Sequence, residues 1–343
     1  MRALSAVAAA LLAAPAIGQE SETPDPLFQS NATLAVTLSA PLATLVRERP
    51  KDDYLPGVFS YEDADGSNVS LDVDIRTRGH FRHKTCDYPP LMLNLKKDQA
   101  DGTLFDHQNK LKLVVHCDYS GNYEQVVLRE YLAYRILNAL TDSSFRVRLL
   151  QVTYVNTEDA DDDSSRYAFL IEHKNRLANR LGLKDLELAR TSVAAIQPDQ
   201  LNLTSVFEFL IGNTDFSPIA GAPDDECCHN YALFGNGEAP IVAVPYDFDQ
   251  SGFVDAPYAR PNALFWLRCL KQRLYRGRCV NNEYVESSLQ VFRDNEKQIY
   301  RLVDEQAGLK PYVRKEITRY IEDFYELIND ARDVKRKIID DCI

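Results

Sequence analysis

The order of strand-like and helix-like segments along the chain constrains its fold more than any other feature of the sequence. Between about residues 30 and 118, short apolar and β-branched segments are separated by Asp, Gly, Asn and Pro, which is typical of strands. These segments read ATLAVTLSA, VSLDVDIRTRG, PLMLNLKK and NKLKLVVHC. The next segment, YEQVVLREYLAYRILNALT, has its apolar residues at helical spacing.

The pattern changes in the second half of the chain. Two more strands, RVRLLQVTYVN and RYAFLIEH, flank the acidic run NTEDADDDSS as the arms of a hairpin would. From about residue 200 onward helical patterns dominate, and only the short strands HNYALFG and IVAVPYDF interrupt them. We therefore predict an α+β protein with a strand-rich N-terminal lobe over residues 31–172 and a mainly helical C-terminal lobe over residues 173–343.

The N-terminus has the pattern of a secretory signal. Residues 1–18 begin with a basic residue, continue with the apolar run AVAAALLAA and end on small residues before the polar stretch QESETPD. We expect a flexible segment over residues 19–30 to follow this signal peptide. The apolar run is too short to span a bilayer and no later run reaches the necessary length. We therefore predict an exported protein, periplasmic or extracellular, without an integral membrane segment.

Seven cysteines in an exported chain predict disulfides and one remaining thiol. The bridges that we expect are Cys269–Cys279, from proximity in the sequence, Cys86–Cys117, from neighbouring strand-like segments, and separate partners for the adjacent Cys227 and Cys228, one of them Cys342. Zinc binding is the alternative for this set, but the chain contains no CxxC pair.

The stretch IVAVPYDFDQSGFV, residues 241–254, places two carboxylates directly after a strand-like run. If the chain stays extended, Asp247 and Asp249 point to the same face and their charges repel. A divalent cation between them would cancel this repulsion, so we predict a metal site here. A pair of carboxylates that caps a turn remains the alternative.

Three more polar residues follow the same logic in the surrounding segments. The apolar helix in FEFLIGNTDFS leaves Asp215 just past its end, CHNYALF places Asn230 at the start of a strand, and YAFLIEH ends a strand at Glu172. In protein kinases, a catalytic base, a metal-binding amide and a metal-binding carboxylate follow one another in the order of Asp215, Asn230 and Asp247, and a strand that ends as at Glu172 leads into the hinge.

The chain resembles the spore-coat CotH-like family of atypical kinases over roughly residues 65–260. The Arg-x-Arg-Gly signature of that family stands here as IRTRGHFRHKTCDYPPLMLNLKK, with matching positions at Arg76, Arg78, Gly79 and Lys96. The other motifs stand as VLREYLAY, AFLIEH, NTDFS, HN and YDFD. The chain departs from the family at Pro90 and Leu91, where two lysines are usual, and in the Cys-rich insert PIAGAPDDECC.

The resemblance implies a bilobal protein-kinase-like fold and the transfer of phosphate from ATP to Ser or Thr of a protein substrate, with Mg²⁺ or Mn²⁺. The implied roles are a catalytic base for Asp215; metal ligands for Asn230, Asp247 and Asp249; phosphate contacts for Lys96 and Arg78; a partner of Lys96 for Glu130; and a nucleotide-binding hinge position for Glu172.

Two other functions fit the same sequence. The chain could be a surface protein with a kinase-like scaffold that has a binding or structural role and catalyses no reaction. It could also bind calcium through DFDQSGFVD, although Tyr258 stands where such a loop needs a bidentate Glu. The net charge of −12 argues against nucleic acid as a partner under any of these functions.

Overall fold

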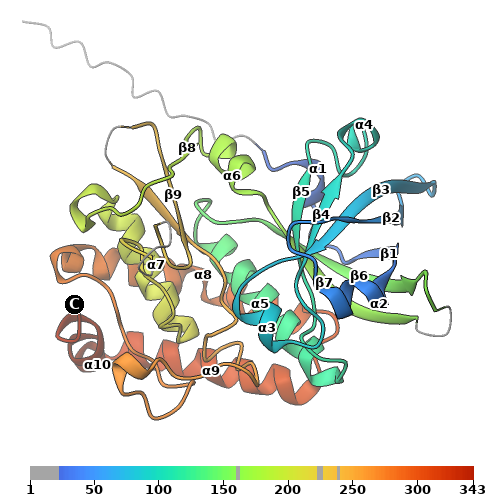
Figure 1. Ribbon diagram of the computed structural model, residues 1–343. Coiled ribbons are helices and arrows are strands. Elements are labelled where there is room, and N and C mark those ends of the chain that lie inside the picture. The colour runs from blue at the N-terminus through green and yellow to red at the C-terminus, as the bar shows by residue number, and fades with distance from the viewer. Residues whose placement is uncertain (1–22, 160–162, 222–226, 238–239) are drawn as a thin grey trace, which may run out of the picture.

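The computed structural model describes residues 23–159, 163–221, 227–237 and 240–343 (Figure 1). The predicted signal peptide lies outside the described residues. The C-terminal end of the segment predicted to be flexible is ordered, because Pro26–Gln29 form the short helix α1. Leu27 and Phe28 of this helix are buried in the core of the strand-rich part, and Asp25 forms an ion pair with Arg176. These contacts hold the end of the segment in place.

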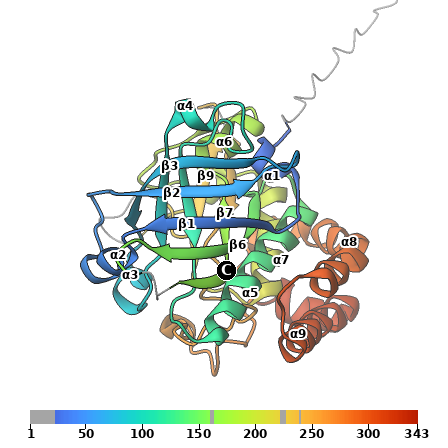
Figure 2. The same cartoon turned by 90° about the vertical axis from the view of Figure 1, so that its right-hand side faces the viewer.

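Seven strands form a closed barrel, in the order β1-β2-β3-β4-β5-β7-β6 around its circumference. The strands are β1 (Leu34–Ala40), β2 (Leu55–Glu62), β3 (Asn68–Thr77), β4 (Leu91–Leu95), β5 (Lys110–Val114), β6 (Val147–Asn156) and β7 (Ser164–Ile171). All neighbours pair antiparallel except β1 and β6, whose parallel ladder closes the ring from Leu34–Leu150 to Ala40–Asn156. Figure 2 shows β1, β2 and β3 side by side across the barrel wall.

This closure contradicts the bilobal protein-kinase-like fold that we predicted, because the strand-rich lobe of that fold is built on an open sheet. We did not predict strand β2 from the sequence, because Pro56 and Gly57 interrupt the apolar pattern there. A Cβ atom at Gly57 would lie 2.8 Å from Ile75 Cδ1 and 2.9 Å from the carbonyl oxygen of Ser39. Glycine is needed here because the barrel wall brings three strands close together.

The remaining chain forms helices and a small sheet. The long helices are α5 (Gly121–Leu140), α7 (Pro198–Ile211), α8 (Val285–Glu305) and α9 (Pro311–Asn329). The short ones are α2 (Leu42–Glu48), α3 (Phe81–Thr85), α4 (Lys97–Ala100), α6 (Lys174–Arg180) and α10 (Ala331–Val334). Strands β8 (Lys184–Asp185), β9 (Tyr231–Gly235) and β10 (Val242–Pro245) form an antiparallel sheet in the order β10-β9-β8.

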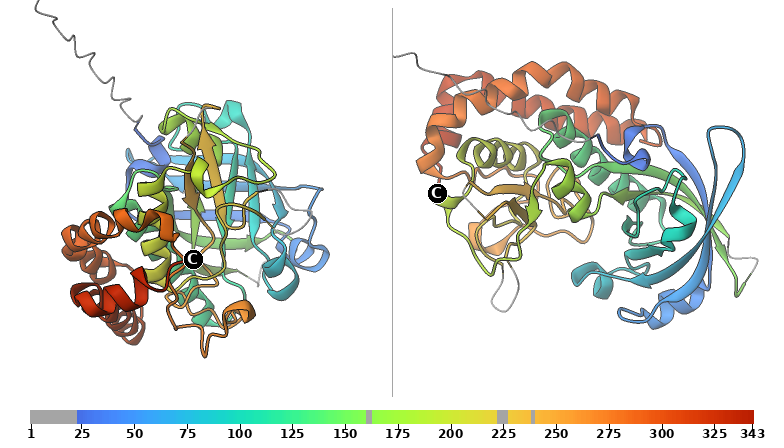
Figure 3. Two further views of the ribbon diagram at one scale, coloured as in Figure 1. Left: turned by 90° about the vertical axis from the view of Figure 1, so that its left-hand side faces the viewer. Right: turned by 90° about the horizontal axis from the view of Figure 1, so that it is seen from above.

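Helix α5 connects the two parts of the molecule, since it packs on β7 of the barrel and on α8 (Figure 1). Figure 3 shows α8 and α9 together along one side of the helical part. The barrel interior has its own apolar core, which includes Leu38, Phe59 and Leu93. A second core joins α5, α7, α8 and α9. Within the described residues, every helix is too short or too polar to cross a membrane.

The disulfides confirm one of the predicted pairs. Cys86 and Cys117 form a disulfide between the end of α3 and the end of β5. The predicted Cys269–Cys279 pair is wrong, because Cys279 bonds to Cys342 and the thiol of Cys269 is free. Cys227 and Cys228, for which we expected separate partners, bond to each other.

Candidate functional site

A cleft of about 790 Å³ opens between the barrel and the helical part. It brings together six of the eight site residues predicted from the sequence: Arg78, Glu130, Asp215, Asn230, Asp247 and Asp249. One wall comes from the ends of β3 and β5 in the barrel. The opposite wall comes from the turns that follow α7 and β10. Residues that are far apart in the sequence therefore face one another across one space.

The acidic turn after β10 is not extended, which was the condition under which we expected Asp247 and Asp249 to point to the same face. The strand ends at Pro245, and Asp247 has a left-handed backbone with φ of 64°. Asp is one of the few non-glycine residues that adopt this conformation readily. The backbone N–H of Asp247 donates to the hydroxyl oxygen of Tyr134 on α5 at 2.9 Å. Asp247 and Asp249 still reach the same cleft, but from a turn rather than from a strand.

Phe248 fixes this turn by pointing the opposite way from its acidic neighbours. Its side chain is fully buried, and its ring centroid lies 4.6 Å from that of Tyr134 and 5.3 Å from that of Phe207 on α7. Because the ring is held between two helices, the carboxylates on either side of it are kept at the floor of the cleft.

Asp247 and Asp249 differ strongly in their surroundings. Asp247 is exposed to the cleft, whereas Asp249 is only 5% exposed and accepts a hydrogen bond from the Tyr258 hydroxyl at 3.0 Å. Burial and the charge of Asp247 raise the pKa of Asp249 to about 7. Burial and the charge of Asp249 also raise the pKa of Glu130 well above its usual range. The floor of the cleft therefore holds three carboxyl groups that disfavour ionisation of one another.

Asp215 is oriented by two neighbours from the start of the small sheet. Helix α7 ends at Gly212, whose φ is 63° and whose Cβ position would lie 2.2 Å from the Tyr320 hydroxyl, so glycine is required for this turn. Three residues later, Asp215 accepts from His229 Nε2 at 2.9 Å and from Asn230 Nδ2 at 3.3 Å. Asn230 Nδ2 also donates to the backbone oxygen of Asp215 at 2.7 Å. The carboxylate is thus positioned before any ligand enters.

Three basic side chains form the barrel side of the cleft. Arg78 donates from Nε to the backbone oxygen of Leu91 at 3.2 Å, and this bond does not use the two terminal nitrogens of its guanidinium group. Arg82 lies 3.8 Å from Glu130 and so offsets part of the negative charge of the floor. Lys112 is exposed to the cleft, but desolvation by the surrounding protein and the nearby charge of Arg78 lower the pKa of its ammonium group to about 8.

Lys96 does not line the cleft. It lies just before α4, and its ammonium group forms an ion pair with Asp74 on the outside of the barrel. Lys112 of β5 is the lysine that faces the acidic turn. Lys110 and Lys112 alternate with buried residues on β5, and β5 pairs with β7 next to the start of the helical part. Glu130, predicted to hold Lys96, lies beside Arg82 instead.

Glu172 lines a smaller apolar extension of the cleft, but its carboxylate is already occupied. It accepts from Arg180 at 3.2 and 3.1 Å and from the backbone N–H of Arg146 at 3.0 Å. The extension measures about 160 Å³. Its residues include Met92, Phe145, Ile171, His173 and Tyr246. Several of its lining residues are shared with the main cleft, so the two spaces adjoin.

The donor atoms fit a hard divalent cation bound partly by substrate. No group of three or more His, Cys, Asp or Glu side chains within the described ranges is arranged to hold a metal by itself. Asp247, Asp249 and the side-chain oxygen of Asn230 are oxygen donors, and Mg²⁺ commonly binds one or two carboxylates together with phosphate and water. The N–H group of Asn230 is occupied by Asp215, so its oxygen is the atom left for a cation.

The residues of the predicted calcium loop form contacts of their own. The Ser251 hydroxyl accepts from the backbone N–H of Val254 at 3.3 Å, and Asp255 forms an ion pair with Lys271 at 2.8 Å. Tyr258, at the position of the missing glutamate, donates to Asp249. These later loop positions therefore already have partners within the protein.

Cation binding at this site is expected to depend on pH through Asp249. With a pKa near 7 the carboxyl group is protonated below neutrality, and the cation must displace that proton. Mn²⁺ affinity should therefore fall about 30-fold from pH 8.5 to pH 5.5. Relaxation of water protons by bound Mn²⁺ measures this. Asp249→Asn is expected to remove most of the pH dependence, and equal wild-type affinities at both pH values would contradict the assignment.

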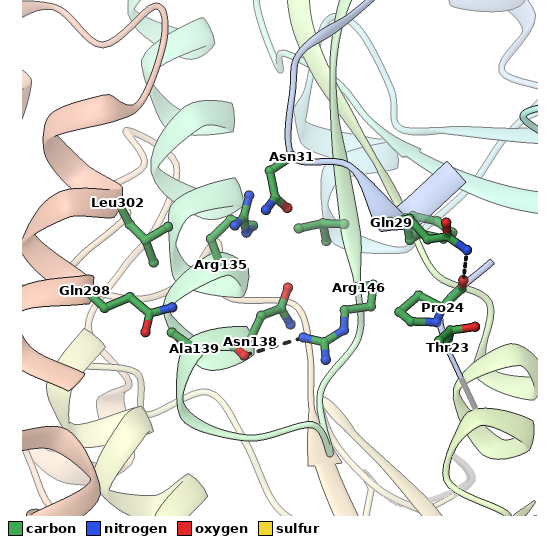
Figure 4. A pocket seen from close by; sticks show the side chains of 12 residues that line it. Thr23, Pro24, Gln29, Asn31, Arg135, Asn138, Ala139, Arg146, Gln298 and Leu302 are labelled. Atoms are coloured by element: carbon green, nitrogen blue, oxygen red, sulfur yellow. Dashed lines mark hydrogen bonds between the residues drawn. The ribbon is translucent and has the colours of Figure 1, made fainter. Parts of the chain in front are cut away.

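A second cavity, of about 600 Å³, lies between the N-terminal segment, α5 and α8 (Figure 4). It is lined by amide side chains and by Arg135 and Arg146, and Figure 4 shows Arg146 directed toward the backbone of Asn138. None of its lining residues in the described part of the chain carries a carboxylate. It therefore lacks a group that could act as a base or as a carboxylate ligand.

Comparisons with known proteins give no family for this chain. No family model matches it, and no curated protein matches it either. The resemblance to CotH-like kinases therefore stays a prediction that rests on short motifs, and the residues of the cleft carry the functional argument.

Proposed function

We propose that this protein is a divalent-metal-dependent phosphotransferase that moves a phosphoryl group from ATP to a Ser or Thr hydroxyl of a protein. One observation carries the proposal. A single cleft places an oriented carboxylate, Asp215, beside an acidic turn, Asp247 and Asp249, and opposite the cations Arg78 and Lys112. Phosphoryl transfer requires these elements because its chemistry depends on positioning and on charge stabilisation.

The cleft offers a different environment to each part of a nucleotide. The apolar extension beside Ile171 and Tyr246 suits a planar base, while Lys112 at the boundary between the two spaces suits the phosphates. Arg78 offers the planar, bidentate geometry that phosphate oxygens favour. The side chain of Glu172 is not needed for binding in this arrangement, and only its place at the wall of the extension matters.

Asp215 acts on the acceptor in the proposed reaction. The acceptor hydroxyl oxygen forms a bond to the γ-phosphorus, the bond between that phosphorus and the β,γ-bridging oxygen breaks, and ADP leaves. The hydroxyl proton passes to the carboxylate of Asp215, which His229 and Asn230 hold in place. The transferred group is kept opposite Arg78 and Lys112 throughout.

Asp247, Asp249 and Asn230 would hold the Mg²⁺ or Mn²⁺ ion. When bound, that ion supplies positive charge to the phosphate oxygens. The acidic turn itself repels phosphate, so its two carboxylates have a use in this reaction only together with a cation. We further propose that the protein is exported, since three disulfides in the described chain suit an oxidising compartment.

A pair of lysine variants tests the site. Lys112→Met is expected to weaken binding of ATP with magnesium about 10- to 100-fold, because it removes a charged contact to phosphate. Lys96→Met is the matched control and should bind like the wild type, because Lys96 lies outside the cleft. Calorimetric titration measures both, and transfer from labelled ATP is assayed in parallel. Equal losses in the two variants would contradict the site, and wild-type binding without any transfer would favour a binding protein without turnover.

A further inference from the structure

The rim of the cleft next to Asp215 has a charge opposite to that of the whole protein. Residues 256–280 contain six Lys and Arg residues and no Asp or Glu, although the chain carries a net charge of −12. Within this segment Arg260 and Asn262 line the cleft directly. The basic segment is therefore adjacent to the place where an acceptor would meet the proposed base.

This segment is anchored to the turn that carries Asp215. Asn262 Nδ2 donates to the backbone oxygen of Thr214 at 3.3 Å. Arg276 donates to the backbone oxygens of Thr214 and Phe216 at 2.9 and 2.6 Å. The same guanidinium group lies 4.5 Å from the ring centroid of Phe265. Both ends of the loop are thus tied to the residues on either side of Asp215.

Large apolar side chains point away from this anchored loop into solvent. Trp266, the only tryptophan of the chain, is 91% exposed, and Leu264 is 79% exposed. Phe81, which lines the cleft from the barrel side, is 51% exposed. Single exposed apolar residues are common, but a group of them beside a proposed active site indicates a surface that another molecule covers.

Two guanidinium groups of the same basic segment remain available for an anionic partner. Arg260 and Arg268 are exposed, and among the described residues neither forms an ion pair. Arg260 donates only to the backbone oxygens of Pro257 and Ala259, so its charge is not neutralised. Lys271, by contrast, is paired with Asp255.

We propose that Phe81, Arg260, Leu264, Trp266 and Arg268, which we term the docking rim, bind the acceptor polypeptide through acidic side chains next to a large apolar one. This inference rests on the proposed phosphotransfer, and it adds the class of acceptor sequence. The apolar side chain covers Leu264 and Trp266, and the carboxylates of the acceptor pair with Arg260 and Arg268. An acceptor hydroxyl is thereby brought to Asp215, since the loop is bonded to Thr214.

Trp266 itself provides the measurement, because it is the source of all tryptophan emission. A synthetic peptide with one Ser, flanking Glu residues and one Leu should shift this emission to shorter wavelength in a saturable way. Peptides with Lys in place of Glu, or Ser in place of Leu, should bind at least about 10-fold more weakly. The double variant Arg260→Gln/Arg268→Gln should lose a similar factor for the Glu peptide. Arg301→Gln, an exposed arginine of α8, is the matched control and should bind like the wild type.

The titrations are done without nucleotide and repeated with Asp247→Asn. Unchanged peptide binding by that variant separates docking from catalysis, so a failed transfer assay would not by itself remove the docking rim. No change in Trp266 emission, or an equal response to the Glu and Lys peptides, would overturn the proposal. Vesicles of phosphatidylglycerol and phosphatidylcholine form a further arm. A shift with vesicles but not with peptides would assign the surface to a membrane and would also overturn it.

Discussion

Asp247→Asn is expected to lower phosphoryl transfer by at least about 10³-fold. The substitution keeps the size of the side chain and removes the negative charge that would hold the cation. A bound cation contributes several kcal/mol to the stabilisation of the transition state. Binding of ATP with magnesium should weaken as well. Stability of the ligand-free protein should be equal or slightly higher, because the repulsion between Asp247 and the buried Asp249 disappears.

Asp215→Asn is the matched comparison, because it removes a carboxylate from the same cleft. This variant should also lose transfer, yet it should bind ATP with magnesium nearly as the wild type does, since a base contacts the acceptor and not the nucleotide. Calorimetry on both variants, with transfer rates from labelled ATP, separates the two roles. If Asp247→Asn binds magnesium and ATP as tightly as the wild type, the acidic turn is not the metal site.

Phe248→Ala is expected to cost about 3–5 kcal/mol of unfolding free energy. The ring is fully buried between Tyr134 and Phe207, so its removal leaves a cavity where the barrel-side helix α5 meets α7. That loss is a large part of the stability of a typical domain. Cation binding should weaken too, because the turn loses the anchor that directs Asp247 and Asp249 into the cleft.

Urea unfolding measures the stability, and Mn²⁺ titration of the folded fraction measures the site. Phe248→Leu serves as the control, because it retains an apolar side chain in the same space and should cost less than about 1.5 kcal/mol. If the alanine variant unfolds with less than about 1 kcal/mol of loss, Phe248 is not the anchor of the turn.

Local patterns in the sequence predicted most elements but not their assembly. The alternation in VSLDVDIRT and KLKLVV gives the strands β3 and β5, and the helical spacing of residues 123–141 gives α5. Barrel closure could not be read in this way, because it depends on pairing β1 with β6 across more than a hundred residues. A period of two residues identifies a strand and its faces, but carries no information about which distant strand will be its neighbour.

The candidate site shows the same limit at the level of single residues. The order of Asp215, Asn230, Asp247 and Asp249 along the chain predicted a shared site, and the cleft does contain all four. The sequence did not distinguish Lys96, directly after β4, from Lys112, within β5, because the two strand segments have similar composition. Only the position of β5 at the mouth of the cleft distinguishes them.

The disulfides illustrate why proximity in the sequence is a poor guide. Cys269 and Cys279 are close along the chain, but the C-terminal residues pack against the turn that precedes α8. The backbone N–H of Cys279 donates to the oxygen of Ile343 at 3.1 Å, and that of Ile343 donates to Gly277 at 2.9 Å. This brings Cys342 beside Cys279.

The parallel ladder between β1 and β6 also sets an order of events during folding. A growing chain can pair β1 with β2 as soon as both have emerged, but the other edge of β1 must wait until the chain has reached Asn156. Closing so long a loop is slow, because the conformational entropy of the loop must be lost before the hydrogen bonds of the ladder stabilise the barrel. During that interval the open edge can recruit strands from other nascent chains, so aggregation of newly made protein should compete with barrel closure rather than with folding of the helices.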